Sequence, residues 1–151
     1  MYKKILVPLD GSELSESVLS HVINIATNCQ VTQVVLMRVR EQLAQDVRIA
    51  LDAETALELD KAYHDEAANY LENVAKTLTQ KGIAIKTEVL EGNPTKAILK
   101  YSKDTDVDLI IMSTHGRSGF SRMVFGSVAD KVLRQTEVPV LLRPASHGAN
   151  K

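Results

Sequence analysis

The sequence predicts an α/β protein built on a single open, mostly parallel, five-stranded sheet with helices on both faces. Five short apolar runs are spaced along the 151 residues, and a helical pattern separates each run from the next. Most of the runs are continuously apolar, which is typical of strands that are buried on both faces of a sheet. Glycine- and proline-containing breaks separate strands from helices at several points.

The first strand and helix are predicted by the opening of the chain. Residues 4–9 form an apolar run and therefore predict a strand. The sequence Asp10-Gly11-Ser12 then breaks the pattern, and either Ser12 or Asp10 is suited to cap the helix that follows. Apolar residues at helical spacing extend this helix to about Thr27.

A second strand and a long helix follow. The valine-rich run at residues 31–39 predicts a buried strand. Residues 40–52 are weakly patterned, and we expect a long loop with room for a short helix. Residues 53–81 predict one long helix whose apolar side includes Ala56 and Tyr63. Gly82 is expected to end this helix, as a glycine after the last turn commonly does.

The remaining elements are shorter. Residues 83–90 alternate in polarity, which favours an edge strand. Asn93 and Pro94 together suit the start of a helix. The later segments are a buried strand at 109–112, a polar loop at 113–126, a helix capped by Ser127, a strand at 138–142 and a polar tail at 145–151. We expect one domain at 1–144 and a flexible tail.

The alternation of elements predicts a Rossmann-like sheet with strand order 3-2-1-4-5. In such sheets ligands bind beyond the carboxyl ends of the strands, where the strand order reverses. That position brings the loop at Asp10 opposite the loop that begins at Ser113. Gly116, Gly119 and Gly126 allow main-chain N–H groups to approach an anion, and the helix at Ser127 offers its N-terminus to a phosphate. The same glycines also suit a purely structural connection between strand and helix.

Composition excludes several classes of function. The net charge is −1 and aromatic residues make up 4%, so neither electrostatics nor stacking favours a nucleic-acid partner. No apolar run approaches the length of about 18 residues that a membrane-spanning helix needs. We expect a cytoplasmic protein without membrane contact. The single Cys29 cannot form an intrachain disulfide, and the four scattered histidines do not indicate a metal site.

Three segments resemble the universal stress protein family, and together with the expected fold they extend the resemblance over nearly the whole chain. They are Lys4-Ile-Leu-Val-Pro-Leu-Asp-Gly-Ser12, the stretch from Met112 to Arg134, and Val138-Pro-Val-Leu-Leu-Arg143. The ATP-binding branch of that family uses Gly-x2-Gly-x9-Gly-Ser/Thr, and here Gly116, Gly126 and Ser127 match its later positions. Ser113 stands where that branch has its first glycine.

The resemblance implies a site for ATP or a related adenine nucleotide, with Mg²⁺ arriving on the nucleotide. By that resemblance Pro8, Leu9 and Asp10 border adenine and ribose, Asp10 accepts from a ribose hydroxyl, and the main chain of Val39 meets the adenine edge. The resemblance also implies that the phosphates are held by Gly116, Gly126, Ser127 and Val128. Arg117 and Arg122 could add positive charge there. The expected site also includes Met112, Ser113, His115 and Gly119.

The resemblance further implies a stress-response or signalling protein. It implies a homodimer through the last strand, where Val138, Val140 and Leu142 make an apolar edge that needs cover. Two alternatives stay open: a slow ATPase, and a nucleotide-free interaction dimer of the same fold, which Ser113 favours. No carboxylate is placed by the sequence to orient His115 as a general base, and the phosphate-binding Walker A loop is absent. A protein partner is expected but not identified.

Overall fold

The computed structural model describes residues 1–114 and 126–144. Five strands form one parallel sheet in the order β3-β2-β1-β4-β5, which confirms the predicted topology. The strands are β1 (Lys4–Pro8), β2 (Gln33–Arg40), β3 (Ile85–Glu91), β4 (Leu109–Ser113) and β5 (Val140–Arg143). The helices are α1 (Glu13–Glu16), α2 (Leu19–Asn28), α3 (Gln45–Ala50), α4 (Ala53–Thr79), α5 (Pro94–Asp104) and α6 (Ser127–Gln135).

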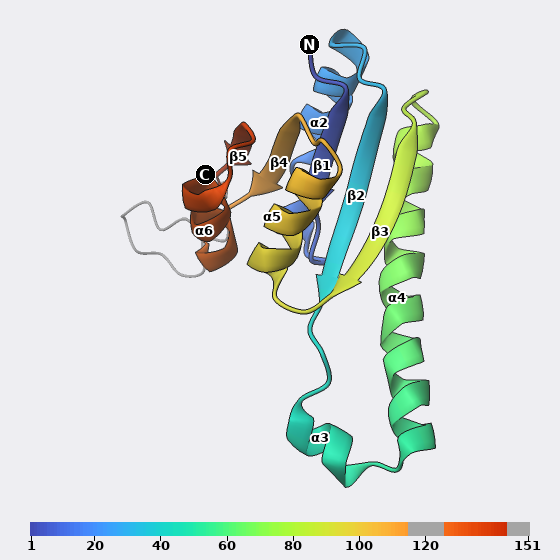
Figure 1. The fold of residues 1–151 in the computed structure, drawn as a ribbon. Coiled ribbons are helices and arrows are strands. Elements are labelled where there is room, and N and C mark those ends of the chain that lie inside the picture. Colours follow the sequence, from blue (N-terminus) through green and yellow to red (C-terminus); the bar gives the residue numbers. More distant parts are fainter. Residues whose placement is uncertain (115–125, 145–151) are drawn as a thin grey trace, which may run out of the picture.

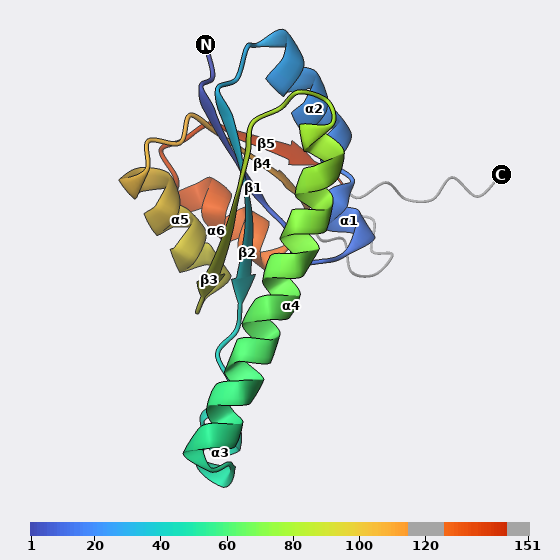
Figure 2. The same ribbon diagram turned by 90° about the vertical axis from the view of Figure 1, so that its right-hand side faces the viewer.

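Helices cover both faces of the sheet (Figures 1 and 2). Alternate residues of each strand point to opposite faces. In β1, Ile5 and Val7 pack into a core beneath α2 and α4, whereas Leu6 packs into a second core beneath α5 and α6. All three side chains are fully buried. The doubly covered sheet explains why the central strands are continuously apolar in sequence.

Local sequence signals set several element boundaries as expected. Asn93 caps α5 by accepting a hydrogen bond from the Lys96 N–H (3.1 Å), and Pro94 occupies the first turn. Ser12 caps α1 by accepting from the Ser15 N–H. After α4 the chain turns at Gly82, whose φ of +79° lies in the region that favours glycine. β3 lies at the edge of the sheet, as its alternating pattern predicted.

Several boundaries differ from the prediction. The first predicted helix is split into α1 and α2, and at the break the Ser17 hydroxyl donates to the Leu14 carbonyl (2.5 Å) in competition with the helix ladder. The segment 40–52 contains α3, the short helix for which the prediction left room. The final strand begins at Val140 rather than Val138, because Pro139 lacks an N–H. Gly126 is the N-cap of α6, and Ser127 is the first helical residue.

The N-terminal half of α4 and the whole of α3 extend past the carboxyl ends of β2 and β3 (Figure 1). The burial of α4 therefore begins at Ala67 and continues through Leu71, Val74 and Leu78. Tyr63, which the helical pattern placed on the inner side, is 47% exposed. Within the described residues, no helix is both long and apolar enough to cross a membrane.

Candidate functional site

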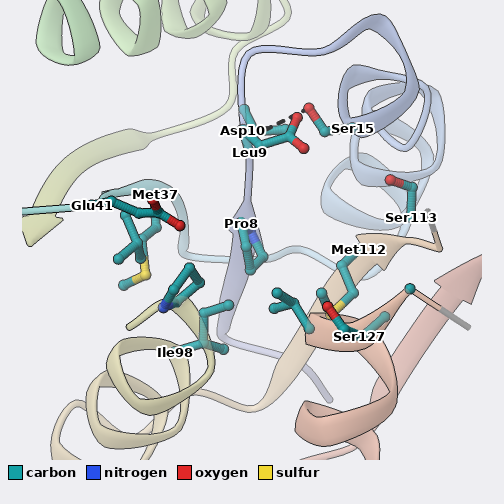
Figure 3. Close-up of a pocket in the computed structure, with 15 residues that line it drawn as sticks. Pro8, Leu9, Asp10, Ser15, Met37, Glu41, Ile98, Met112, Ser113 and Ser127 are labelled. Carbon is teal, nitrogen blue, oxygen red and sulfur yellow. Dashed lines mark hydrogen bonds between the residues drawn. The ribbon is translucent and has the colours of Figure 1, made fainter. Parts of the chain in front are cut away.

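A cavity of about 320 Å³ opens at the carboxyl ends of β1, β2 and β4, against the first turns of α5 and α6 (Figure 3). It lies beside β1, where the strand order reverses and the connections on either side leave in opposite directions. Its size falls within the range of small-molecule sites. Nine residues expected in the site line it: Pro8, Leu9, Asp10, Val39, Met112, Ser113, Gly126, Ser127 and Val128.

Four other expected site residues, His115, Gly116, Arg117 and Gly119, lie outside the described residues, as does Arg122. Six lining residues were not expected. They are Ser15, Met37, Glu41, Pro94, Ile98 and Ala129. Met37 and Glu41 share the side-chain direction of Val39 along β2 and could have been found from that alternation. Pro94 and Ile98 come from α5, whose position over the site depends on tertiary packing.

The turn after β1 fixes one rim of the cavity. Oδ1 of Asp10 accepts hydrogen bonds from the N–H (2.9 Å) and the hydroxyl (2.5 Å) of Ser12. Between them Gly11 has a φ of +87°, a conformation that other residues rarely adopt. The N–H of Asp10 donates to the Ser15 hydroxyl (3.3 Å), which in turn donates to the Ser12 carbonyl (2.8 Å). The Asp10 carboxylate is therefore held in a defined orientation.

The main chain of β2 presents polar groups to the same cavity. Leu9 N–H donates to the Met37 carbonyl (2.8 Å), the last rung of the β1–β2 ladder in the described part of the chain. On the other side of β2, the carbonyl of Arg40 accepts from Gly92 (3.0 Å), so even-numbered residues bond toward β3. Val39, two residues beyond Met37, therefore turns its N–H and C=O toward the space that β1 has left.

One end of the cavity is apolar. Met37 and Ile98 belong to the core beneath α5 and α6, and Val39 packs against that core. Pro8 and Pro94 complete this wall, and Met112 from β4 lies further along it. Figure 3 shows Met37, Pro8, Ile98 and Met112 around the opening. A flat apolar group of a ligand would bury its faces here.

The other end of the cavity is the N-terminus of α6. Gly126 occupies the N-cap with φ −52° and ψ 149°, and no side chain caps the helix in the described structure. The first intrahelical bond runs from Asp130 N–H to the Gly126 carbonyl (2.9 Å), so the N–H groups of residues 127–129 precede the helical ladder. Together with the helix dipole, such groups attract anions.

Ser113 lies at the end of β4 and is 7% exposed. Its β4 neighbour Met112 points to the α5–α6 face, so the side chain of Ser113 points to the opposite face, where Figure 3 shows it near α1. The hydroxyl therefore stands at the edge of the cavity rather than across its centre.

An ion-pair cluster fixes the carboxyl end of β2. The guanidinium of Arg40 donates two hydrogen bonds to Asp60 of α4 (2.9 and 3.1 Å) and one to Glu91 of β3 (2.5 Å). These bonds lower the pKa of the Asp60 carboxyl and raise the pKa of Arg40. Because Arg40 adjoins Val39 in sequence, the cluster holds the polar main-chain groups of that residue in place.

A second set of contacts joins α4 to α1 behind the site. The hydroxyl of Tyr70 donates to Glu16 (2.8 Å), and the guanidinium of Arg38 lies 5.1 Å from the centre of the Tyr70 ring. Arg38 also pairs with Glu66 (3.4 Å). Burial, reinforced by the Glu16 carboxylate, raises the pKa of Tyr70, so its hydroxyl stays a donor at physiological pH.

The chemistry of the cavity suits a ligand with a flat apolar part and an anionic part. Within residues 1–114 and 126–144, no group of three or more His, Cys, Asp or Glu side chains is arranged to hold a metal ion. The fold and this cavity define an open, doubly wound α/β protein with a cavity at the switch point of the sheet.

Comparison with known proteins identifies the family. The universal stress protein family model matches residues 1–144, and the chain belongs to that family. Two universal stress proteins of Methanocaldococcus jannaschii, MJ0531 and MJ0577, are each 34% identical to it. Both alignments cover 94% of this chain, with 82% of MJ0531 and 94% of MJ0577.

Solved structures of related proteins have the same fold as this chain. The structure of MJ0577 superposes with a TM-score of 0.82 at 34% identity, over 97% of this chain and 98% of that one. A universal stress protein in complex with cAMP has the same fold (TM-score 0.70, 18% identity, 96% and 98% coverage). So does a family protein of Arabidopsis thaliana with AMP bound (TM-score 0.69, 13% identity, 96% and 93% coverage).

Proposed function

We propose that this universal stress protein binds ATP in the switch-point cavity and acts as a nucleotide-dependent sensor in a stress response. The supporting observation is the cavity itself, in which an apolar wall and a helix N-terminus without a side-chain cap face the same space. Proteins of this fold have been solved with cAMP and with AMP, so the fold accommodates adenine nucleotides.

Each part of the nucleotide has a matching part of the cavity. Adenine would lie against Met37, Val39 and Pro94, with its polar edge on the Val39 main chain. The ribose would hydrogen-bond to the Asp10 carboxylate, which Ser12 already orients. The phosphates would take the N–H groups of residues 127–129 at the start of α6. Mg²⁺ would arrive as part of the nucleotide complex, coordinated mainly by phosphate oxygens and water.

Signalling is the proposed outcome of binding, and slow hydrolysis is the alternative activity. The turn that holds Asp10 begins α1, and α1 contacts α4 through Glu16 and Tyr70. A nucleotide that engages Asp10 can therefore bias the position of α4 through hydrogen-bonded elements. Phosphate release well above background at saturating ATP would instead establish an ATPase.

We place the protein in the cytoplasm. We also propose that it pairs with a second copy of itself through β5. β5 is an edge strand, and its residues are all half-buried within one chain. Val140 and Leu142 pack on the α5–α6 core while keeping part of their surface exposed. Pairing with the same strand of a partner would satisfy the open edge. Light scattering at micromolar concentration should give a dimer, and a monomer would contradict this part of the proposal.

Isothermal titration calorimetry with ATP, AMP and GTP tests the binding proposal, with Gly126→Val as the disabling variant. The φ of −52° at Gly126 is accessible to valine, so the substitution adds bulk at the phosphate end without backbone strain. Ala44→Val is the matched control. Ala44 is also an N-cap without a side-chain bond, has nearly the same backbone angles (−54°, 142°), and belongs to α3, away from the cavity.

We expect micromolar ATP binding by the wild type and by Ala44→Val, and a loss of at least about tenfold in Gly126→Val. A folded wild type that binds no nucleotide would overturn the proposal. It would favour a nucleotide-free interaction dimer, for which Ser113 in the first glycine position of the family motif is the specific observation.

A further inference from the structure

Glu41 projects a carboxylate into the base end of the switch-point cavity. It follows β2 directly, and two-residue alternation gives it the side-chain direction of Met37 and Val39. Figure 3 shows its carboxylate reaching from the β2 end toward Pro8, across the apolar part of the opening. Glu41 and Asp10 are the ionisable residues among the described residues that line the cavity.

The Glu41 carboxylate takes no part in the neighbouring ion pairs of Arg40. The neighbouring Arg40 bonds to Asp60 and Glu91, on elements away from the cavity. Among the described residues, Glu41 enters none of the side-chain hydrogen bonds or salt bridges. An acceptor thus stands at the apolar end of the cavity, opposite the anion-attracting N-terminus of α6.

The placement of Glu41 has a chemical consequence for the base. An ionised carboxylate only accepts hydrogen bonds. A base with an amino group at position 6, as in adenine, can donate to it. A base with an oxo group at position 6, as in hypoxanthine and guanine, would place two acceptors face to face. Such a mismatch loses the hydrogen bond and sets the carboxylate against the oxo group, although water offsets part of this penalty because Glu41 is exposed.

Resting on the proposed nucleotide function, we infer that Glu41 determines base specificity by accepting a hydrogen bond from the 6-amino group of adenine. Two points place that group near Glu41. The proposed function assigns the phosphates to the N-terminus of α6, so the base would occupy the far, apolar end. The main chain of Val39 faces the base edge, and the Glu41 backbone lies about 7 Å further along the strand direction, within reach of a glutamate side chain.

A paired titration with ATP and ITP tests this role, because the two nucleotides differ at position 6 and at the adjacent ring N–H. Glu41→Gln is the informative variant: its amide is nearly the same size but can donate to a 6-oxo group as well as accept. Glu58→Gln is the matched control, since Glu58 is also an exposed carboxylate but lies on α4 outside the cavity. Thermal unfolding confirms that each variant is folded.

We expect the wild type and Glu58→Gln to prefer ATP over ITP by about tenfold or more, and Glu41→Gln to reduce that preference to about threefold or less. Equal affinities of the wild type for ATP and ITP would overturn the inference, as would a preference that survives in Glu41→Gln. Both results leave ATP binding intact and the proposed function standing. Failure of the folded wild type to bind either nucleotide would overturn the proposed function together with this inference.

Discussion

Asp108 joins the start of β1 to β4, and replacing it should destabilise the whole sheet. Its Oδ2 accepts hydrogen bonds from the main-chain N–H groups of Lys3 and Lys4, both at 2.8 Å. Its own N–H donates to the Lys4 carbonyl (2.9 Å). These contacts join residues more than 100 positions apart in sequence, so they fix the central β1–β4 pairing on which the cavity depends.

The magnitude follows from the two bonds that Asp108→Ala removes. A hydrogen bond to a charged group contributes about 1.5–3 kcal/mol when it is buried. The Lys3 bond is exposed and water can replace it, whereas the Lys4 bond is partly buried. We therefore expect Asp108→Ala to lower the free energy of unfolding by about 2 kcal/mol, and Asp108→Asn by about 1 kcal/mol, because an oxygen acceptor remains.

The loss of stability in the Asp108 variants should depend on pH. The hydrogen bonds from Lys4 and Lys3 lower the pKa of the Asp108 carboxyl in the folded protein. A carboxyl with a lowered pKa contributes stability above its unfolded pKa of about 3.9, and this contribution disappears as the pH falls through the folded value. The difference between wild type and Asp108→Asn should be complete at pH 7 and should shrink below about pH 4.

Urea unfolding followed by circular dichroism measures both effects. Asp106→Asn is the control, because Asp106 is exposed and its φ of +51° is one that asparagine tolerates. A stability of Asp108→Ala within about 0.5 kcal/mol of wild type at pH 7, equal to that of the control, would refute the reasoning.

Two further predictions test the core and the site. Leu71→Ala should lower the free energy of unfolding by about 2–5 kcal/mol because Leu71 is fully buried. Leu57 lies on the same helix but is 71% exposed, so Leu57→Ala should change it by less than about 0.5 kcal/mol. Equal effects in urea unfolding would contradict the burial assignment. Gly11→Ala should lower the free energy of unfolding by about 1–2 kcal/mol and weaken ATP binding, because the φ of +87° strains an alanine. The added Cβ itself would meet Arg38 at an ordinary 3.6 Å. Unchanged stability and affinity would show that the turn can relax.

The sequence was sufficient to predict the sheet and most helix starts because those features depend on local chemistry. Continuous apolar runs identified the central strands, and Asn93 with Pro94 identified α5. The break near Ser17 was missed because the apolar spacing continues across it, and only the side-chain bond to Leu14 marks the break. Tyr63 was placed on the inner side because periodicity cannot show that the sheet ends before the helix does.

The site was predictable where it follows strand ends. Pro8 and Val39 lie at the carboxyl ends of β1 and β2, Asp10 follows β1, and topology alone brings those positions together. Glu41 continues the alternation of Met37 and Val39 but was missed, because a lone glutamate after a strand resembles an ordinary surface residue. Its significance depends on the position of α5, which closes the cavity opposite it, and helix packing of that kind has no local sequence signal.

The central claim is that a nucleotide occupies the switch-point cavity with its base at β2 and its phosphates at α6. Amide resonances in ¹H–¹⁵N correlation spectra, recorded during titration with ATP, test it most directly. We predict that Val39, Ser127 and Val128 shift together and saturate at a single affinity, while the amides of Lys4 and Gln33, at the amino ends of β1 and β2, stay unchanged. Shifts that gather on another surface, or spectra that do not respond to ATP, would contradict the account.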